Sequence, residues 1–203
     1  MSVIIIISIV ALIPIAVLVV MLMANQRLVG HYRVLARNLG LELETRRRTI
    51  FSDPFIRGTF RGRAVEIERV RRNQGENTRP HAFVKVECKN PGERVLLIYP
   101  KVLKLMGFKF DIDASIKLKQ FQTGDADFDN QFIVKTNSEA FALKLLSQPV
   151  RSALCKSNCM GGISYTPRGL FFEQPGDLDT ELQRQRIEEM IPQVAALADK
   201  IAS

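Results

Sequence analysis

An uninterrupted apolar run near the amino end constrains this chain more than any other feature. From Val3 to Met23 the only polar side chain is Ser8, and no residue from Met1 to Gln26 is charged. These 21 residues, at about 1.5 Å of rise per helical residue, match a bilayer hydrocarbon core of roughly 30 Å. A soluble helix has no need of an apolar surface on every side. We therefore expect residues 1–26 to form a transmembrane anchor, in which Pro14 is tolerated as a kink.

The main alternative for this run is a cleaved signal peptide. Signal peptides have a basic amino-terminal region, an apolar stretch of about 7–15 residues and a small-x-small cleavage site. Here no Lys or Arg precedes the run, and the best cleavage position, after Ala24, has Leu22 where a small residue is needed. We therefore favour an uncleaved anchor, which makes the lipid bilayer the first partner of the protein.

Basic residues follow the apolar run and predict its orientation. Lys and Arg remain on the cytoplasmic side of a span, and the only positive charge before this run is the α-amino group. We expect a single-pass protein of the inner (plasma) membrane, with its amino terminus outside and its domain in the cytoplasm. The residues expected to contact the membrane surface are Arg27, Arg33, Arg37, Arg46, Arg47 and Arg48. An odd number of cysteines, three, agrees with a reducing compartment.

Residues 27–40 have the apolar spacing of an amphipathic juxtamembrane helix that ends at Gly40. The apolar stripe consists of Leu28, Tyr32, Leu35 and Leu39. This stripe could pack on the protein's own domain or lie on anionic lipid. The sequence leaves both alternatives open.

Residues 41–203 read as a single domain of short strands and short helices. Arg61-Gly62 and Pro167-Arg168-Gly169 are turn signals between alternating apolar stretches, so each predicts a β-hairpin. Other expected strands are 81–89 and 94–99, paired as a hairpin, and an apolar strand that ends near 136. Expected loops are 71–80 and the acidic stretch that starts at 124. Expected helices are 102–106, 139–146, 149–157 and a last helix, capped by Asp177 or Asp179 and kinked or divided at Pro192, that runs towards Ala202.

The expected fold class is therefore an α+β domain behind a single transmembrane helix. We expect a curved antiparallel sheet of about seven strands, with short helices and a C-terminal helix packed on it. A pleckstrin-like roll is one form that such a sheet could take. Strand order is not readable from one sequence.

Charge is distributed unevenly along the chain. Residues 27–110 contain 19 basic and 8 acidic side chains, whereas residues 111–203 contain 10 and 13. The basic, membrane-proximal half could therefore orient the domain on an anionic leaflet, although a solvated surface on the positive side of the membrane gives the same pattern. Nucleic acid is not an expected partner, because no nucleic-acid motif is present and the chain has no Trp.

Groups that could carry chemistry are few. The run Asp125-Ala-Asp127-Phe-Asp129 resembles the start of a calcium loop but has Asn130 where Gly is required and Thr136 where Glu is required. Cys155 and Cys159 could share a helix face, but a structural zinc site needs four ligands. His31 and His81 are the only possible imidazole bases, and neither lies in a known catalytic motif. We expect no catalytic residue, no metal site, no cofactor and no small-molecule substrate.

The segment Phe128-Asp-Asn-Gln-Phe-Ile-Val134, followed by a short helix that ends in Leu-Leu-Ser147, resembles a group of uncharacterised bacterial membrane-anchored proteins. The strand Gly169-Leu-Phe-Phe-Glu173 fits the same layout. The resemblance covers about 45 residues and implies a membrane anchor. It implies no activity and no catalytic residue.

These observations support three hypotheses of function. The first is a non-enzymatic accessory or scaffold subunit of a membrane protein complex, with an unidentified membrane protein as its partner. The second is a membrane-anchored domain that senses anionic lipid through its basic half. The third is an enzyme with an unrecognised site, which would need a deep pocket around His81.

Overall fold

The computed structural model describes residues 2–47, 52–74, 77–90, 92–108, 110, 115–157 and 159–202. Within this part of the chain, side chains are described from Ile13 onward, except at 45–47, 52–53, 73–74 and 77. The helices are α1 (Ser2–Leu39), α2 (Lys101–Leu105), α3 (Ala126–Gln131), α4 (Glu139–Leu145), α5 (Gln148–Lys156) and α6 (Glu181–Ala202). The strands are β1 (Glu42–Arg47), β2 (Ser52–Phe60), β3 (Arg63–Gln74), β4 (Asn77–Val86), β5 (Leu96–Pro100), β6 (Lys119–Phe121), β7 (Phe132–Thr136), β8 (Gly162–Thr166) and β9 (Gly169–Pro175).

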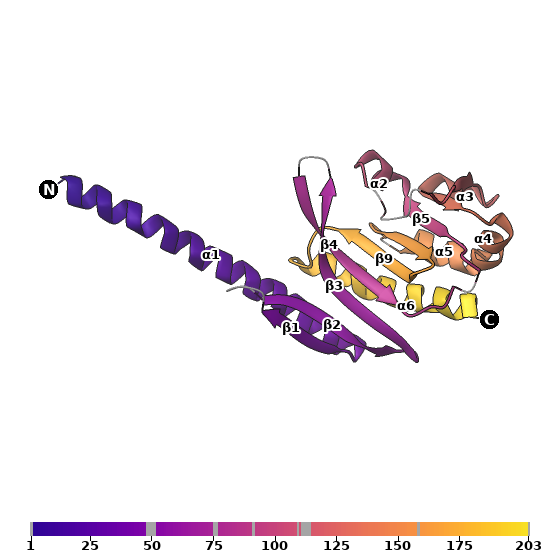
Figure 1. The fold of residues 1–203 in the computed structure, drawn as a ribbon, viewed down its shortest axis with the longest axis horizontal. Coiled ribbons are helices and arrows are strands. Elements are labelled where there is room, and N and C mark those ends of the chain that lie inside the picture. The colour runs from indigo at the N-terminus through magenta and orange to yellow at the C-terminus, as the bar shows by residue number, and fades with distance from the viewer. Residues whose placement is uncertain are drawn as a thin grey trace.

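One antiparallel sheet organises the domain. In the described residues it has nine strands in the order β1-β2-β3-β4-β9-β8-β5-β7-β6, and all eight neighbouring pairs are antiparallel. The sheet is curved, and α6 crosses one of its faces (Figure 1). The predicted architecture, an apolar N-terminal helix followed by a curved antiparallel sheet with short helices and a C-terminal helix, is confirmed, but the described sheet has nine strands where about seven were predicted. The domain has in common with a pleckstrin-like roll the C-terminal helix that packs on the sheet.

Helix α1 contains both of the amino-terminal segments expected from sequence. Its 38 residues run without interruption from Ser2 through the apolar run to Leu39. The helix then ends at Gly40, which has φ +66°, and the Leu41 N–H donates to the Ala36 carbonyl at 2.8 Å. Such a left-handed glycine is the common way to close a helix and turn the chain back. Strand β1 therefore returns along α1.

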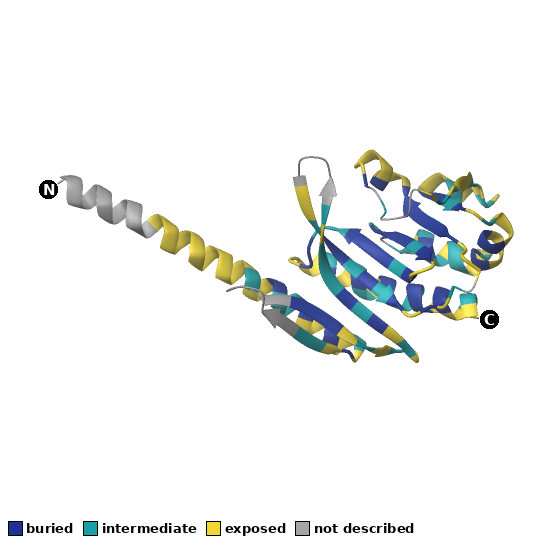
Figure 2. Cartoon of the chain, in the orientation of Figure 1, coloured by how far each residue is buried: buried dark blue, intermediate teal, exposed yellow. Residues whose placement is uncertain are grey.

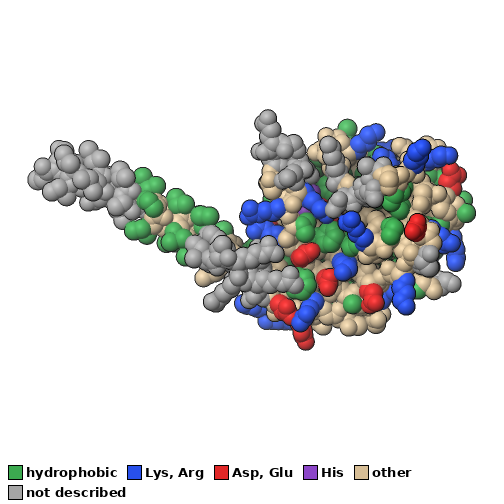
Figure 3. Space-filling model, viewed as in Figure 1, with side chains coloured by type: hydrophobic (Ala, Val, Ile, Leu, Met, Phe, Trp, Pro, Cys, Tyr) green, Lys and Arg blue, Asp and Glu red, His purple; other side chains and the backbone are tan. Residues whose placement is uncertain are grey.

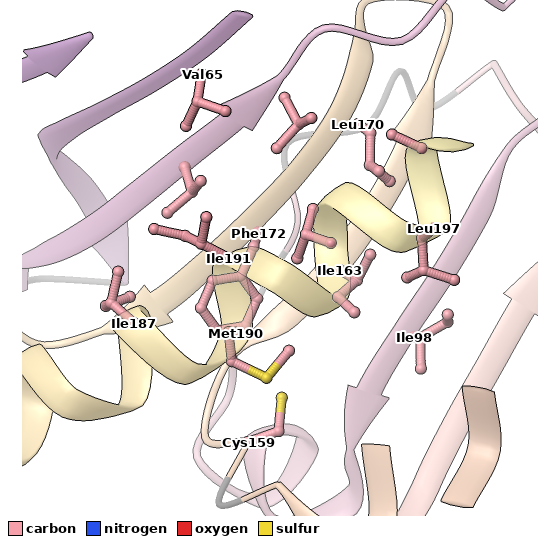
Figure 4. Close-up of a cluster of buried hydrophobic side chains, with 14 of the residues drawn as sticks. Val65, Ile98, Cys159, Ile163, Leu170, Phe172, Ile187, Met190, Ile191 and Leu197 are labelled. Carbon is pink, nitrogen blue, oxygen red and sulfur yellow. The ribbon is translucent and has the colours of Figure 1, made fainter. Parts of the chain in front are cut away.

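The main core lies between the sheet and α6. Buried side chains of alternate strand positions meet one face of α6, as the labelled residues in Figure 4 show. The apolar face of α6 was predicted correctly, and its Ile187, Ile191, Val194 and Leu197 are buried. A smaller cluster covers the opposite face of the sheet near α2. It consists of Leu97, Tyr99, Leu103, Phe108 and Ile133.

The hairpins with strong turn signals are confirmed, but one predicted loop and one predicted strand pairing are wrong. The polar stretch 71–80 is not a loop, because β3 and β4 continue through it and pair to Gln74↔Asn77. The stretch is polar because this part of the hairpin projects beyond the sheet (Figure 1), where it has no core to face. Strand β5 does not pair with β4, since β9 and β8 lie between them.

Three further predictions also need correction. The acidic stretch forms helix α3, with Asp125 as its N-cap accepting from the Phe128 N–H. Helix α6 is capped by Thr180, whose Oγ1 accepts from the Gln183 N–H at 3.3 Å, and not by Asp177 or Asp179. Of the two predicted effects of Pro192, a kink or a division of the last helix, division is wrong, because α6 continues as one helix to Ala202.

Candidate membrane-facing site

The amino-terminal part of α1 is apolar and fully outside the domain. From Ile13 to Met23 every described side chain is exposed, and most are large and apolar. Figures 2 and 3 show this stretch as an exposed apolar rod beside the folded domain. Among the described residues, α1 is the one helix that is long and apolar enough to cross a membrane, judged by length and composition.

The same helix then enters the main core without a linker. Leu28, Tyr32, Leu35 and Ala36 are between 0% and 5% exposed and belong to the core that α6 and the sheet form. The apolar stripe predicted at residues 27–40 therefore packs on the protein's own domain. Of the two alternatives for this stripe, the structure shows the first.

Polar contacts hold α1 beside α6. The Asn38 amide donates to Glu188 at 3.0 Å, and His31 Nδ1 lies 3.9 Å from a Glu181 carboxylate oxygen. Arg184 bridges both of these glutamates from within α6. Since His31 pairs with the start of α6 and Asn38 with its second turn, the two helices run in the same direction.

The antiparallel order of the sheet places a defined set of turns towards the anchor. Strand β1 runs back along α1, so its end at Arg47 points towards the apolar half of α1 (Figure 1). We call this end of the sheet the near edge and the opposite end the far edge. Alternation across the sheet brings to the near edge the ends of β1, β3, β9 and β5 and the starts of β2, β4, β8 and β7.

The predicted membrane-surface arginines occupy different levels above the apolar run. Arg27, Arg33 and Arg37 are all exposed on α1. At about 1.5 Å per residue, Arg33 lies roughly 9 Å and Arg37 roughly 15 Å beyond Arg27 along the helix axis. For a bilayer whose hydrocarbon core ends at Met23, Arg27 is therefore the one of these three arginines that lies at the depth of the headgroups. A headgroup layer is about 5–8 Å deep.

The second group of predicted arginines lies at the β1–β2 turn. The backbone of Arg46 and Arg47 ends β1 at the near edge, and Arg48 lies outside the described residues. The six residues of β1 extend about 17 Å back along α1, which corresponds to roughly 11 helical residues from Leu39. The structure thus brings Arg47 close to the level of Arg27, although the two are far apart in the sequence.

A buried polar cluster lies at the near edge behind these turns. Glu173 of β9 is 4% exposed. Its carboxylate accepts hydrogen bonds from Arg72 Nε at 2.8 Å and from Arg72 Nη2 at 3.1 Å. His81 Nδ1 of β4 lies 2.8 Å from the same carboxylate, and the His81 ring stacks on Phe108 at 5.4 Å. Burial raises the pKa of Glu173, but the hydrogen bonds from His81 and Arg72 outweigh it, so the pKa is lowered overall.

The two acid–base groups of this cluster are buried and contact each other. His81 is 0% exposed, so a substrate cannot reach its ring, and Glu173 is committed to two cationic or polar partners. A second buried pair, Arg69 with Asp177 at 2.7 Å, lies beside it, and burial raises the pKa of Asp177 despite the arginine. Sequence analysis considered His81 only as a possible base and did not anticipate either pair, because the partners are about 100 residues apart.

The acidic run and the cysteines have structural roles where the chain is described. Asp129 accepts hydrogen bonds from the Thr123 N–H, the Thr123 hydroxyl and the Gly124 N–H, and so fixes the turn before α3. Cys88, Cys155 and Cys159 are free thiols, and burial raises the pKa of Cys159 to about 11. No three His, Cys, Asp or Glu side chains gather as a metal site within the described residues.

One near-edge element exposes apolar side chains that sequence analysis did not single out. Helix α2 follows β5, and only Leu103 of its five residues is buried. Leu105 is 87% exposed and Met106 just after the helix is 49% exposed. The sequence predicted a helix at 102–106 but not its exposure, since the exposed face of one helical turn cannot be read from five residues.

Comparison with known proteins gives one informative result. No protein-family model matches this sequence, and no curated protein sequence matches it either. Among solved structures, the chain is similar to the crystal structure of the mycobacterial trehalose monomycolate transport factor A, TtfA, with a TM-score of 0.57 and 14% sequence identity. The match covers 86% of this chain and 94% of that chain, so the likeness extends over nearly the whole fold.

Proposed function

We propose that this protein is a non-enzymatic, single-pass membrane protein whose domain acts as an accessory or scaffold subunit of a membrane protein complex. In this proposal α1 spans the bacterial inner membrane with its amino terminus outside. The domain then lies in the cytoplasm, with its near edge towards the lipid surface. The direction of the span rests on the arginines that follow it.

The direct passage of α1 into the domain core is the observation that carries this proposal. An enzyme that only needs to stay near a membrane can be held by a flexible linker. Here Leu28 lies five residues after Met23 and is already buried in the core. Such a connection fixes which edge of the domain faces the membrane, and a fixed orientation is what a scaffold needs.

Two further observations support the proposal. Of the described groups that could perform chemistry, His81 and Glu173 are buried and paired with each other, and burial raises the pKa of the Cys159 thiol. The fold is also similar to that of TtfA, a mycobacterial transport factor. We infer that the complex served by this protein is a membrane transport system.

The proposal can be tested by breaking the connection between anchor and domain. Inserting Gly-Ser-Gly-Ser between Asn25 and Gln26 keeps the apolar run and the buried part of α1 but makes the orientation free. The full chain is purified from native membranes in mild detergent, and co-purifying proteins are quantified by mass spectrometry. We expect one membrane protein at stoichiometric level with the native chain and its loss with the insertion.

A matched insertion provides the control. The same four residues placed after Gly62, in the exposed β2–β3 turn at the far edge, leave the connection intact. This variant should retain the partner. Retention of the partner by the Asn25–Gln26 insertion would contradict the proposed role of orientation, and absence of any stoichiometric partner from the native chain would contradict the scaffold function.

Sensing of anionic lipid is a second candidate, favoured by the exposed arginines at the near edge. Because α1 is part of the core, a fragment that starts at residue 41 would lack Leu28, Tyr32 and Leu35, and the test needs the full chain. Amide hydrogen exchange of residues 42–57 is measured in neutral and in anionic nanodiscs at low salt. Slower exchange in anionic nanodiscs, reversed by high salt, is expected for a sensor. Equal exchange in both would remove this candidate.

A further inference from the structure

We propose that α2 is a second membrane contact of this protein. In this proposal Val102, Leu105 and Met106 enter the headgroup region of the bilayer that α1 spans, and Lys101 and Lys104 face anionic lipid phosphates. The inference rests on the proposed anchor and adds a second point of attachment, which would fix the rotation of the domain about the α1 axis.

The exposure of α2 is the first observation behind this inference. Leu105 is 87% exposed, Met106 49% and Val102 40%, although all three are large and apolar. Single exposed apolar residues are common on soluble proteins, but a contiguous group marks an interaction surface. Val102 also borders a shallow hollow of about 340 Å³ with a mixed lining, in which Pro100 and Met160 lie beside Gln131 and Arg186.

The place of α2 in the fold is the second observation. Strand β5 ends at the near edge, and α2 begins at the next residue. This edge also contains the end of β1, the start of β2 and the projecting β3–β4 hairpin, and the apolar half of α1 extends away from the domain on this side (Figure 1). A span continuous with the core therefore holds α2 on the side of the domain that faces the lipid.

The domain also fixes the conformation of α2. Leu103 is fully buried, and Phe108 after the helix stacks on the buried His81 ring, which contacts Glu173. These contacts hold the inner face of the segment against the sheet. Leu105 and Met106 are consequently presented outward instead of folding back onto the domain.

Charge favours an anionic bilayer as the occupant. The run Pro100–Phe110 contains three lysines and no acidic residue, and Lys101 and Lys104 are exposed beside the apolar group. Arg71 and Arg79 are exposed on the β3–β4 hairpin at the same edge. Lysines beside exposed leucine and methionine are typical of segments that lie in a membrane interface.

The absence of tryptophan from the chain allows a direct test. Leu105→Trp places a single indole fluorophore at the most exposed apolar position of α2. The full-length variant is reconstituted in vesicles of phosphatidylcholine and phosphatidylglycerol, with or without bromine on the acyl chains. We expect blue-shifted emission that brominated lipid quenches about two-fold, since interfacial segments bury their apolar side about 5–10 Å into the headgroup boundary.

Two matched variants complete the experiment. Leu143→Trp reports from α4 at the far edge, where the leucine is 51% exposed, and should emit as an exposed indole without quenching. Val20→Trp reports from the apolar half of α1 and should be strongly quenched. Neither position lies in the core, so all three variants are expected to fold.

The outcomes separate the two proposals. Quenching of Val20→Trp without quenching of Leu105→Trp would overturn the α2 contact and leave the anchor standing. Failure of both would overturn the anchor and the α2 contact together. A blue shift of Leu105→Trp without quenching by brominated lipid would mean that protein, such as a second copy of the chain, covers α2, and this also overturns the proposal.

Discussion

At the scale of single residues, Glu173 is the group on which the near edge depends most. Its carboxylate joins β9 to Arg72 of β3 and to His81 of β4, and it is 4% exposed. Glu173→Gln keeps the shape of this buried side chain but removes the negative charge that pairs with the partly buried Arg72 guanidinium. We expect the free energy of unfolding to fall by about 3 kcal/mol, as measured by chemical denaturation of the full chain in mild detergent.

A matched pair on the surface provides the control for this substitution. Glu66 lies 3.1 Å from Lys85, and both side chains are nearly half exposed. Glu66→Gln should change the free energy of unfolding by less than about 1 kcal/mol, because exposed ion pairs are weak. Equal effects of the two substitutions would show that the buried position of Glu173 has no special role.

The stabilisation by Glu173 also has a predicted pH dependence. The pKa of its carboxyl is lowered in the folded protein, despite burial, by His81 and Arg72. A lowered pKa gives stabilisation that is complete above the ordinary glutamate pKa of 4.5 and is lost as the pH falls through the folded value. The difference in the free energy of unfolding between the native chain and Glu173→Gln should therefore be largest at neutral pH and should decrease in acid.

At the scale of elements, α1 joins an exposed apolar half, long enough to cross a membrane, to a half that is buried in the core. Leu35 of α1 is 0% exposed and packs in the core, whereas the neighbouring Val34 is 39% exposed. We expect Leu35→Ala to reduce the free energy of unfolding by about 3 kcal/mol, within the range for buried leucines. Near-UV circular dichroism during denaturation measures this, because it follows the domain and not the apolar run.

Val34→Ala is the control and should change stability by less than about 0.5 kcal/mol. If Leu35→Ala were as mild as Val34→Ala, α1 would contact the domain without being part of its core. The fixed orientation proposed above would then lose its basis.

Local signals in the sequence predicted most elements, and distant pairing is what they could not supply. The Pro167-Arg168-Gly169 turn identified the β8–β9 hairpin because its two strands adjoin in sequence. Nothing local shows that β9 and β8 separate β4 from β5, or that Arg72 meets Glu173, since those contacts form between segments about 100 residues apart. The β3–β4 extension was missed for another reason: a hairpin arm with both faces in water lacks the alternation that identifies a strand.

The candidate site was predictable in part for the same reasons. Composition alone identified the apolar run and the arginines after it, because membrane insertion depends on summed side-chain chemistry. The exposed state of Leu105 depends on which face of α2 meets β5, and this is a tertiary property. Sequence analysis could therefore identify the apolar run that we propose as an anchor, but not the exposed side chains of α2.

At the scale of the whole molecule, the orientation of the domain can be tested with its own thiols. Cys88 and Cys159 are buried with raised pKa values, and Cys155→Ser removes the remaining, partly exposed thiol. Leu143→Cys in that background adds one exposed thiol at the far edge. We expect a membrane-impermeant maleimide to leave it unlabelled in intact cells and to label it in inverted membrane vesicles.

Ser2→Cys in the same background reports from the other side of the span and should show the reverse pattern. Labelling of Leu143→Cys in intact cells would place the domain outside and overturn the direction predicted from the arginines. This result would leave the fold and the anchor unchanged, because both directions of the span are compatible with the same structure.

The uninterrupted path from the apolar rod into the core has a mechanical consequence. A helix responds to a thinner bilayer by leaning, since leaning shortens its projection on the membrane normal. In this protein no flexible linker would take up the tilt of α1. The tilt would therefore rotate the whole domain, so that α4 and the far edge move sideways and the near edge moves towards or away from the lipid surface. The thickness of the surrounding lipid would thereby be translated into the angle at which the domain meets whatever binds it.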